Sequence, residues 1–103
     1  MSHELVEKTA GLTSRVSNLI IHHTGEYCRQ LMEAEDRLSK LLLVAIVKEL
    51  KHEHEAYKAA LEGLNAAIEY IGDADKAIDG IVKAIRLTNK AINLIEKALK
   101  KAI

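Results

Sequence analysis

The 103-residue sequence contains no proline, tryptophan or phenylalanine, and it has a single cysteine, Cys28. One cysteine excludes a disulfide framework within the chain, so a reducing, cytoplasmic environment is the simplest expectation. The longest apolar run, Leu41–Val47, has seven residues. A helix that spans a bilayer requires roughly 20. No signal peptide is expected either, because the sequence does not start with basic residues followed by an apolar stretch.

An excess of one charge is also missing, since 15 basic and 15 acidic residues give a formal net charge of zero. A protein dedicated to nucleic acid usually carries a clear basic excess, so we expect no nucleic-acid partner. Short β-branched runs between turn residues, the mark of β-sheet proteins, are absent too. The abundant Ala, Leu, Glu and Lys residues favour helices, and the sequence predicts a single all-α domain over residues 1–103.

Apolar periodicity predicts three helices, over residues 3–24, 26–71 and 74–102. Gly25 is expected to take the left-handed conformation that ends the first helix. The second helix is unusually long, and its C-terminal half follows the alternating four- and three-residue spacing of a coiled coil. The Gly72–Asp73 pair predicts a tight turn into the third helix. The fold class is therefore an all-α chain of antiparallel helical hairpins with a long central helix.

The third helix carries an apolar seam and, beside it, an alanine stripe. Folding this helix back about the predicted turn sets larger side chains of the second helix against alanines, with His54 opposite Ala91. The same alignment places Tyr57 opposite Thr88. It predicts a close hairpin with a polar layer of His54, Tyr57 and Thr88 that defines the register. The alanines recur every seven residues, at Ala77, Ala84, Ala91 and Ala98.

The run Leu41–Val47 is apolar around the whole circumference of the second helix, and such a helix is normally covered on all sides. The first and third helices cover two sides, which leaves one side for another chain. The sequence therefore predicts a homo-oligomer, most simply a dimer. The alternative is a monomeric three-helix bundle in which the second helix is broken or kinked near residues 38–42. The predicted interface residues are Leu41, Leu42, Val44, Ala45 and Ile46.

A dense polar cluster occupies residues 48–55. Glu49 and His52 form a Glu-x-x-His pair, the spacing that helical di-iron proteins use in their bundle cores, and Glu53 is a further oxygen donor nearby. A dimer would supply a second pair. Because Glu49 lies off the apolar seam, a solvated charged face is the competing interpretation. An iron or zinc site at these three residues stays open, and no other cofactor is expected.

No catalytic motif is present: the sequence lacks a glycine-rich phosphate loop, a Cys-x-x-Cys pair and a serine with matched histidine and acid partners. We therefore expect a non-enzymatic interaction or assembly module that self-associates through the apolar centre of its second helix, with room for an unidentified protein partner. One alternative is a metal-binding bundle. Another is a membrane-surface or secretion-associated protein, because the end of the third helix is basic and amphipathic. The alanine stripe favours a bundle over a membrane surface.

The two halves of the chain differ in character. Repeated Ala, Ile and Lys residues make the C-terminal half regular enough for a designed bundle. The N-terminal half, with two adjacent histidines and Cys28, is more typical of a natural sequence. The pattern leaves the origin open.

Overall fold

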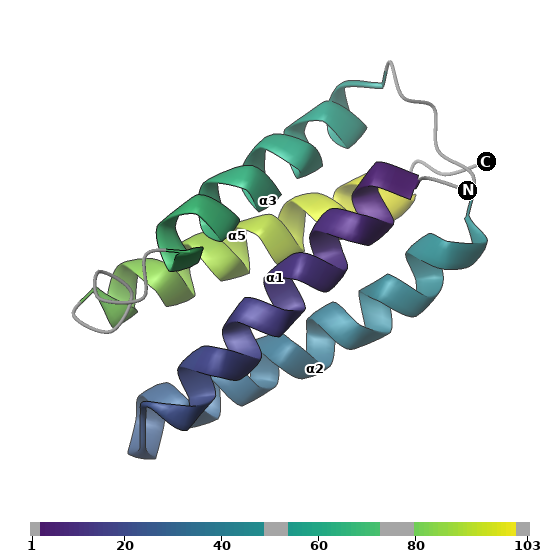
Figure 1. The fold of residues 1–103 in the computed structure, drawn as a ribbon. Helices are drawn as coiled ribbons and strands as arrows, with labels where there is room; N and C mark the ends of the chain where they lie inside the picture. Colours follow the sequence, from purple (N-terminus) through teal and green to yellow (C-terminus); the bar gives the residue numbers. More distant parts are fainter. Residues whose placement is uncertain (1–2, 49–53, 73–79, 101–103) are drawn as a thin grey trace.

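The computed structural model describes residues 3–48, 54–72 and 80–100. Within these ranges the chain forms helices and no strand, which confirms the all-α prediction. The helices pack into a bundle with extents of 40 × 20 × 17 Å (Figure 1). They are α1 (His3–Ile21), α2 (Gly25–Val47), α3 (Glu55–Gly72) and α5 (Ile81–Lys100).

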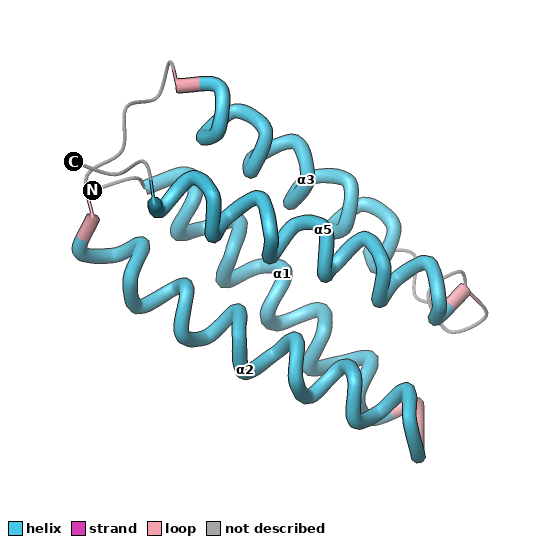
Figure 2. Tube along the Cα trace, turned by 180° about the vertical axis from the view of Figure 1, so that it is seen from behind, coloured by secondary structure: helices cyan, strands magenta, loops and turns pink. Residues whose placement is uncertain are grey.

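The bundle consists of two antiparallel hairpins that lie side by side. Helix α1 pairs with α2, and α3 pairs with α5; across the two hairpins α1 lies beside α3, and α2 lies beside α5. Figure 2 shows α2 and α5 together on one side of the bundle. Helices α1 and α3 run in the same direction, and Lys8 Nζ donates to Asn65 Oδ1 at 2.7 Å between them. Because these four pairs are the neighbours, α2 and α3, which follow each other in the chain, occupy diagonal corners of the bundle.

The predicted continuous helix over 26–71, and with it the three-helix count, was wrong. Helix α2 ends at Val47, and Lys48 has an extended backbone with φ −95° and ψ 141°. The alternative, an interrupted second helix, was nearer to the structure, but it placed the interruption near 38–42, where α2 is helical, rather than after Val47. A continuous rod would leave much of its apolar seam without a partner, whereas folding back covers it. Packing therefore outweighs local helix propensity here.

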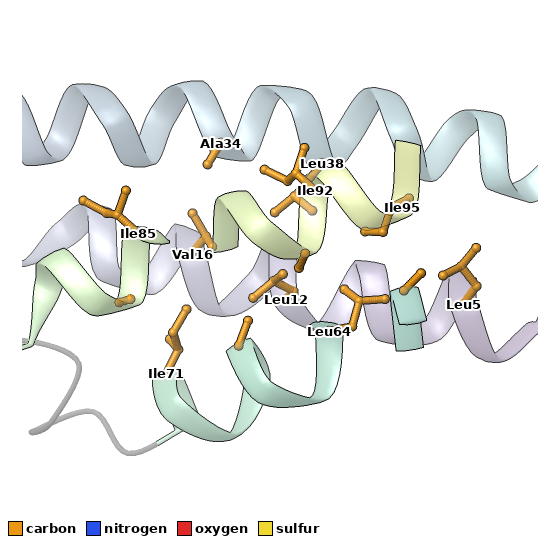
Figure 3. Close-up of a cluster of buried hydrophobic side chains, with 14 of the residues drawn as sticks. Leu5, Leu12, Val16, Ala34, Leu38, Leu64, Ile71, Ile85, Ile92 and Ile95 are labelled. Carbon is orange, nitrogen blue, oxygen red and sulfur yellow. The ribbon is translucent and has the colours of Figure 1, made fainter. Parts of the chain in front are cut away.

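The core is built from seams whose residues are spaced by three and four. In α1, Leu5, Leu12, Val16 and Leu19 recur at helical spacing in the sequence, and all four are buried. Figure 3 shows side chains from all four helices, among them Leu12 and Leu64, gathered around one centre. Helix α5 contributes both predicted stripes as far as the described residues extend. Its buried residues are Ile81, Ala84, Ile85, Thr88, Ala91, Ile92, Ile95, Ala98 and Leu99.

Large and small side chains alternate along the seams, which lets neighbouring helices interdigitate. At Gly63, α3 and α5 approach each other closely. A Cβ atom added there would lie 2.7 Å from Leu94 Cδ1 and 3.5 Å from Ala91 Cα. A side chain at position 63 would therefore have to displace Leu94, whereas glycine fits against α5. The buried alternation in α3 is Tyr57, Ala60, Leu64, Ala67 and Ile71.

The α3–α5 hairpin exists, but its predicted register was wrong. Ala91 lies against Gly63 rather than His54, a shift of nine residues along α3. The predicted turn required a left-handed Gly72 outside the helix, whereas Gly72 is the last residue of α3, and among the described residues only Gly25 has a positive φ, 67°. Residues 73–79, which include Ala77 and the start of the predicted third helix, lie outside the described residues. Gly25 has the predicted left-handed conformation, but α1 already ends at Ile21, and Gly25 is the first residue of α2.

Two buried threonines differ in how their hydroxyls are satisfied. Thr88 Oγ1 donates to the Ala84 carbonyl at 2.8 Å. Thr9 Oγ1 has no hydrogen-bond partner among the described residues.

We expect Thr9→Val to raise the free energy of unfolding by about 1 kcal/mol, because it removes a buried hydroxyl that forms no bond. Thr88→Val is the matched control and should gain less, since it also removes a formed bond.

Urea denaturation followed by circular dichroism measures both changes. A Thr9→Val protein that is less stable than the original chain would contradict this account of the core.

Candidate interaction surfaces

The apolar run at the C-terminal end of α2 is divided between the core and the surface. Ala45 is fully buried, and Leu41 packs against the core cluster. Leu42 is half-buried. The expectation that this run is covered on every side therefore does not hold within one chain, because the side that faces away from the bundle stays open. Ala45, which was predicted at an interface between chains, belongs to the core of its own chain.

Four apolar side chains within five consecutive residues remain on the outer side of α2, and we call them the α2 patch: Leu43, Val44, Ile46 and Val47. Leu43 is 68% exposed and Val47 is 79% exposed. They lie one helical turn apart, so their side chains are neighbours. Clusters of large exposed apolar residues are uncommon on monomeric proteins and often mark contact sites.

Charged residues border the α2 patch. On α2, Lys40 pairs with Asp36 at 2.9 Å. Toward α5, Arg37 pairs with Glu96, which ties the two helices together. A shallow pocket of about 270 Å³ continues from the patch toward the end of α5; Val44 and Leu99 line it with Lys48 and Lys100. An apolar centre with a charged rim is the usual composition of a protein interface.

A second surface lies between α2 and α5, where a groove of about 690 Å³ opens on the outer side of the bundle. Ile85 is buried in its floor, and Val82 and Tyr27 add exposed apolar surface. Asparagine and glutamine side chains complete its polar lining, and no acidic residue lines it. We call it the basic groove, after its three cations Arg86, Lys90 and Lys97.

Sequence reasoning missed the basic groove because the predicted continuous helix over 26–71 would keep Tyr27 and Gln30 away from α5. The charges did carry a signal for the observed α3–α5 register, since α3 and α5 carry opposite charges at the same seven-residue spacing. In the observed register, Glu62 and Lys90 line the same pocket of about 300 Å³. Opposite charges on facing helices commonly select the register. The two series are Glu55, Glu62 and Glu69 on α3, and Lys83, Lys90 and Lys97 on α5.

The three residues of the predicted polar layer occupy different environments. His54 is exposed just before α3, where its Nδ1 accepts from the Ala56 N–H at 3.0 Å. Tyr57 is buried near the start of α1, and Thr88 bonds within its own helix. The structure does not bring the three together, because the layer depended on a register that the α3–α5 hairpin does not have.

The predicted metal ligands Glu49, His52 and Glu53 all lie outside the described residues. In the described part of the chain, no three His, Cys, Asp or Glu side chains gather in a way that could hold a metal ion. Across the same ranges, every helix is too short or too polar to span a bilayer.

His54 acts as the N-cap of α3, because its ring accepts the second N–H of the helix and its carbonyl accepts from the Lys58 N–H at 3.1 Å. We expect His54→Ala to lower the free energy of unfolding by about 1 kcal/mol. His54→Asp should retain or exceed the original stability, since aspartate is a strong N-cap and its charge favours a helix N-terminus. Chemical denaturation compares the three proteins. Equal stability of the alanine variant would rule out the cap.

Burial raises the pKa of the Tyr57 phenol above its ordinary value of 10.0, the negative charge of Glu4 raises this pKa further, and an interaction with the Leu5 backbone partly opposes the shift. The contribution of Tyr57 to the free energy of unfolding is therefore fully present below about pH 10. It is lost as the pH rises through the higher pKa of the folded state. We expect the stability of Tyr57→Phe to fall less steeply above pH 10 than that of the original chain.

Urea denaturation between pH 8 and pH 11.5 measures this difference. Tyr27→Phe, at a partly exposed tyrosine, is the matched control and should follow the original chain. If Tyr57→Phe and Tyr27→Phe lose stability along the same curve, buried Tyr57 is not the source of the alkaline decline.

Comparison of this chain with protein-family models, with curated proteins and with solved structures finds no match. Its functional interpretation therefore depends on the two surfaces that the fold presents, the α2 patch and the basic groove.

Proposed function

We propose that this chain is a non-enzymatic helical assembly module that self-associates through the α2 patch. One observation carries the proposal: four apolar side chains at the end of α2 stay on the outside after the bundle has formed. In water this surface is costly to leave exposed, and burying it against an equivalent surface is favourable. A second copy of the chain offers such a surface by symmetry.

A two-fold axis through the α2 patch is the simplest geometry, because the same residues then meet on both chains. Leu43 and Val47 are the most exposed members and would form the centre of the contact. The charged residues around them, such as Lys40 and Lys48, would stay at the rim in contact with water. The patch is small, so we expect a dimer that dissociates on dilution rather than an obligate one.

The composition of the two surfaces supports a non-enzymatic role. The α2 patch contains no titratable side chain. The basic groove is lined by cations, amides, one tyrosine and aliphatic residues, without histidine, cysteine, serine or a carboxylate. General acid–base and nucleophilic catalysis most often use the residue types that both surfaces lack. Binding is the activity that these residue types support best.

The α2 patch is tested by placing a charge at its centre. We expect the original chain to show a mass that rises from monomer to dimer with concentration in light scattering. Leu43→Asp and Val47→Asp should each raise the dissociation constant by about ten- to a hundredfold, since a buried leucine or valine contributes about 1.5–3 kcal/mol. Both side chains are exposed in the monomer, so helicity should be retained.

Val82→Asp is the matched control, because Val82 is 61% exposed and lies outside the patch. Its effect on the mass should be negligible. Ala45→Asp is unsuitable as a probe of association, since it places a charge in the core and should unfold the chain. A constant monomer mass at all concentrations, or equal dissociation by Val82→Asp, would contradict self-association through the α2 patch.

A further inference from the structure

The basic groove has the length and openness of a binding site for a helix. Its lining on α5 extends from Val82 to Lys97, fifteen residues further along. At 1.5 Å per residue this is about 22 Å, or roughly four helical turns. The groove is an open trough along α5 rather than an enclosed cavity, and α2 lines it with Tyr27 and Gln30. A ligand that lies along it in an extended manner would use the whole surface, whereas a small molecule would use only part.

Charge in the groove has one sign. Arg86, Lys90 and Lys97 are exposed. None of the three forms an ion pair with another residue in the described ranges. Glu62 lies on the α3 side of Lys90 and lowers the positive potential there. Arg86 and Lys97 have no such neighbour in the groove lining. Unpaired cations beside an apolar floor complement a ligand that is both acidic and amphipathic.

We propose that the basic groove binds an acidic amphipathic helix of a partner protein. Apolar residues of that helix at positions i, i+3 or i+4, and i+7 would pack on Val82, Ile85 and Leu94. Its carboxylates, on either side of the apolar face, would meet Arg86 and Lys97 in charge-assisted hydrogen bonds. The groove shares no residue with the α2 patch. The inference is therefore independent of self-association.

A tryptophan-labelled peptide tests this proposal directly, because the protein contains no tryptophan of its own. The probe is a helical peptide of about 16 residues with leucine on one face, glutamate on the others and one tryptophan on the apolar face. We expect saturable binding with a blue shift of tryptophan emission. Binding should weaken severalfold between about 50 and 200 mM salt, because the shorter Debye length screens the charges.

Two variants separate the charged and the apolar parts of the groove. Arg86→Glu should raise the dissociation constant of the peptide at least tenfold, and the new glutamate suits a helix with Lys90 four residues later. Val82→Asp should have a similar effect, since it places a negative charge on the apolar wall of the groove, where it repels the glutamates of the peptide. Val82 is largely exposed, so the fold should tolerate the change.

Two matched controls lie outside the groove. Lys58→Glu makes the same change of charge at an exposed position on α3, and Val47→Asp makes the same apolar-to-acidic change on the α2 patch. Both should bind the peptide like the original chain. Val47→Asp should at the same time lose self-association, while Arg86→Glu should keep it, so the failure of one proposal is distinguishable from the failure of the other.

Three results would overturn the proposal. The first is the absence of saturable binding up to about 1 mM peptide; a dissociation constant of 1 mM corresponds to a binding free energy of about −4 kcal/mol. The second is an equal loss of binding in Lys58→Glu, which would indicate attraction to general charge. The third is binding to phosphatidylglycerol vesicles that depends on Arg86 while the peptide does not bind, which would make the groove a lipid-surface site.

Discussion

Mutual coverage of the apolar seams is the constraint on which the rest of the structure depends. Each helix has about 20 residues, and most of the stability of such a helix in a protein comes from the packing of its apolar side, which the other helices cover. Helix α5 is central to this coverage. It buries two stripes rather than one, and it lies against both α2 and α3. The two hairpins are held together along two lines of contact, α1 against α3 and α2 against α5.

The surfaces available for binding are what this coverage leaves over. Helix α2 is the longest of the four, with 23 residues, and its last turns carry apolar residues on the outer as well as the inner side. The outer ones form the α2 patch. Arg37 and Glu96 join α2 to α5 between the patch and the basic groove. The bundle thus presents an apolar surface and a cationic surface on α2 and α5, joined at one ion pair.

The register of the α3–α5 hairpin shows why a correct burial pattern gave a wrong alignment. The alanine stripe of α5 was predicted to be buried, and Ala84, Ala91 and Ala98 are buried. A burial pattern, however, shows which side of each helix is covered and not which residues of the two helices lie opposite each other, so it does not by itself choose the register. In the observed register, Glu62 of α3 and Lys90 of α5 line the same pocket. Gly63, against Ala91, marks the outcome.

The sequence by itself determined the helical class, the seam of α1, the two stripes of α5 and the conformation of Gly25, because each depends on residues within a few turns of one another. Only the tertiary structure decided that the chain leaves the helix after Val47, that His54 caps α3, and that Leu43 and Val47 face outward. These features depend on a balance between segments far apart in the chain. A local pattern encodes which side of a helix is apolar, and the packing of the whole bundle decides which apolar side is covered.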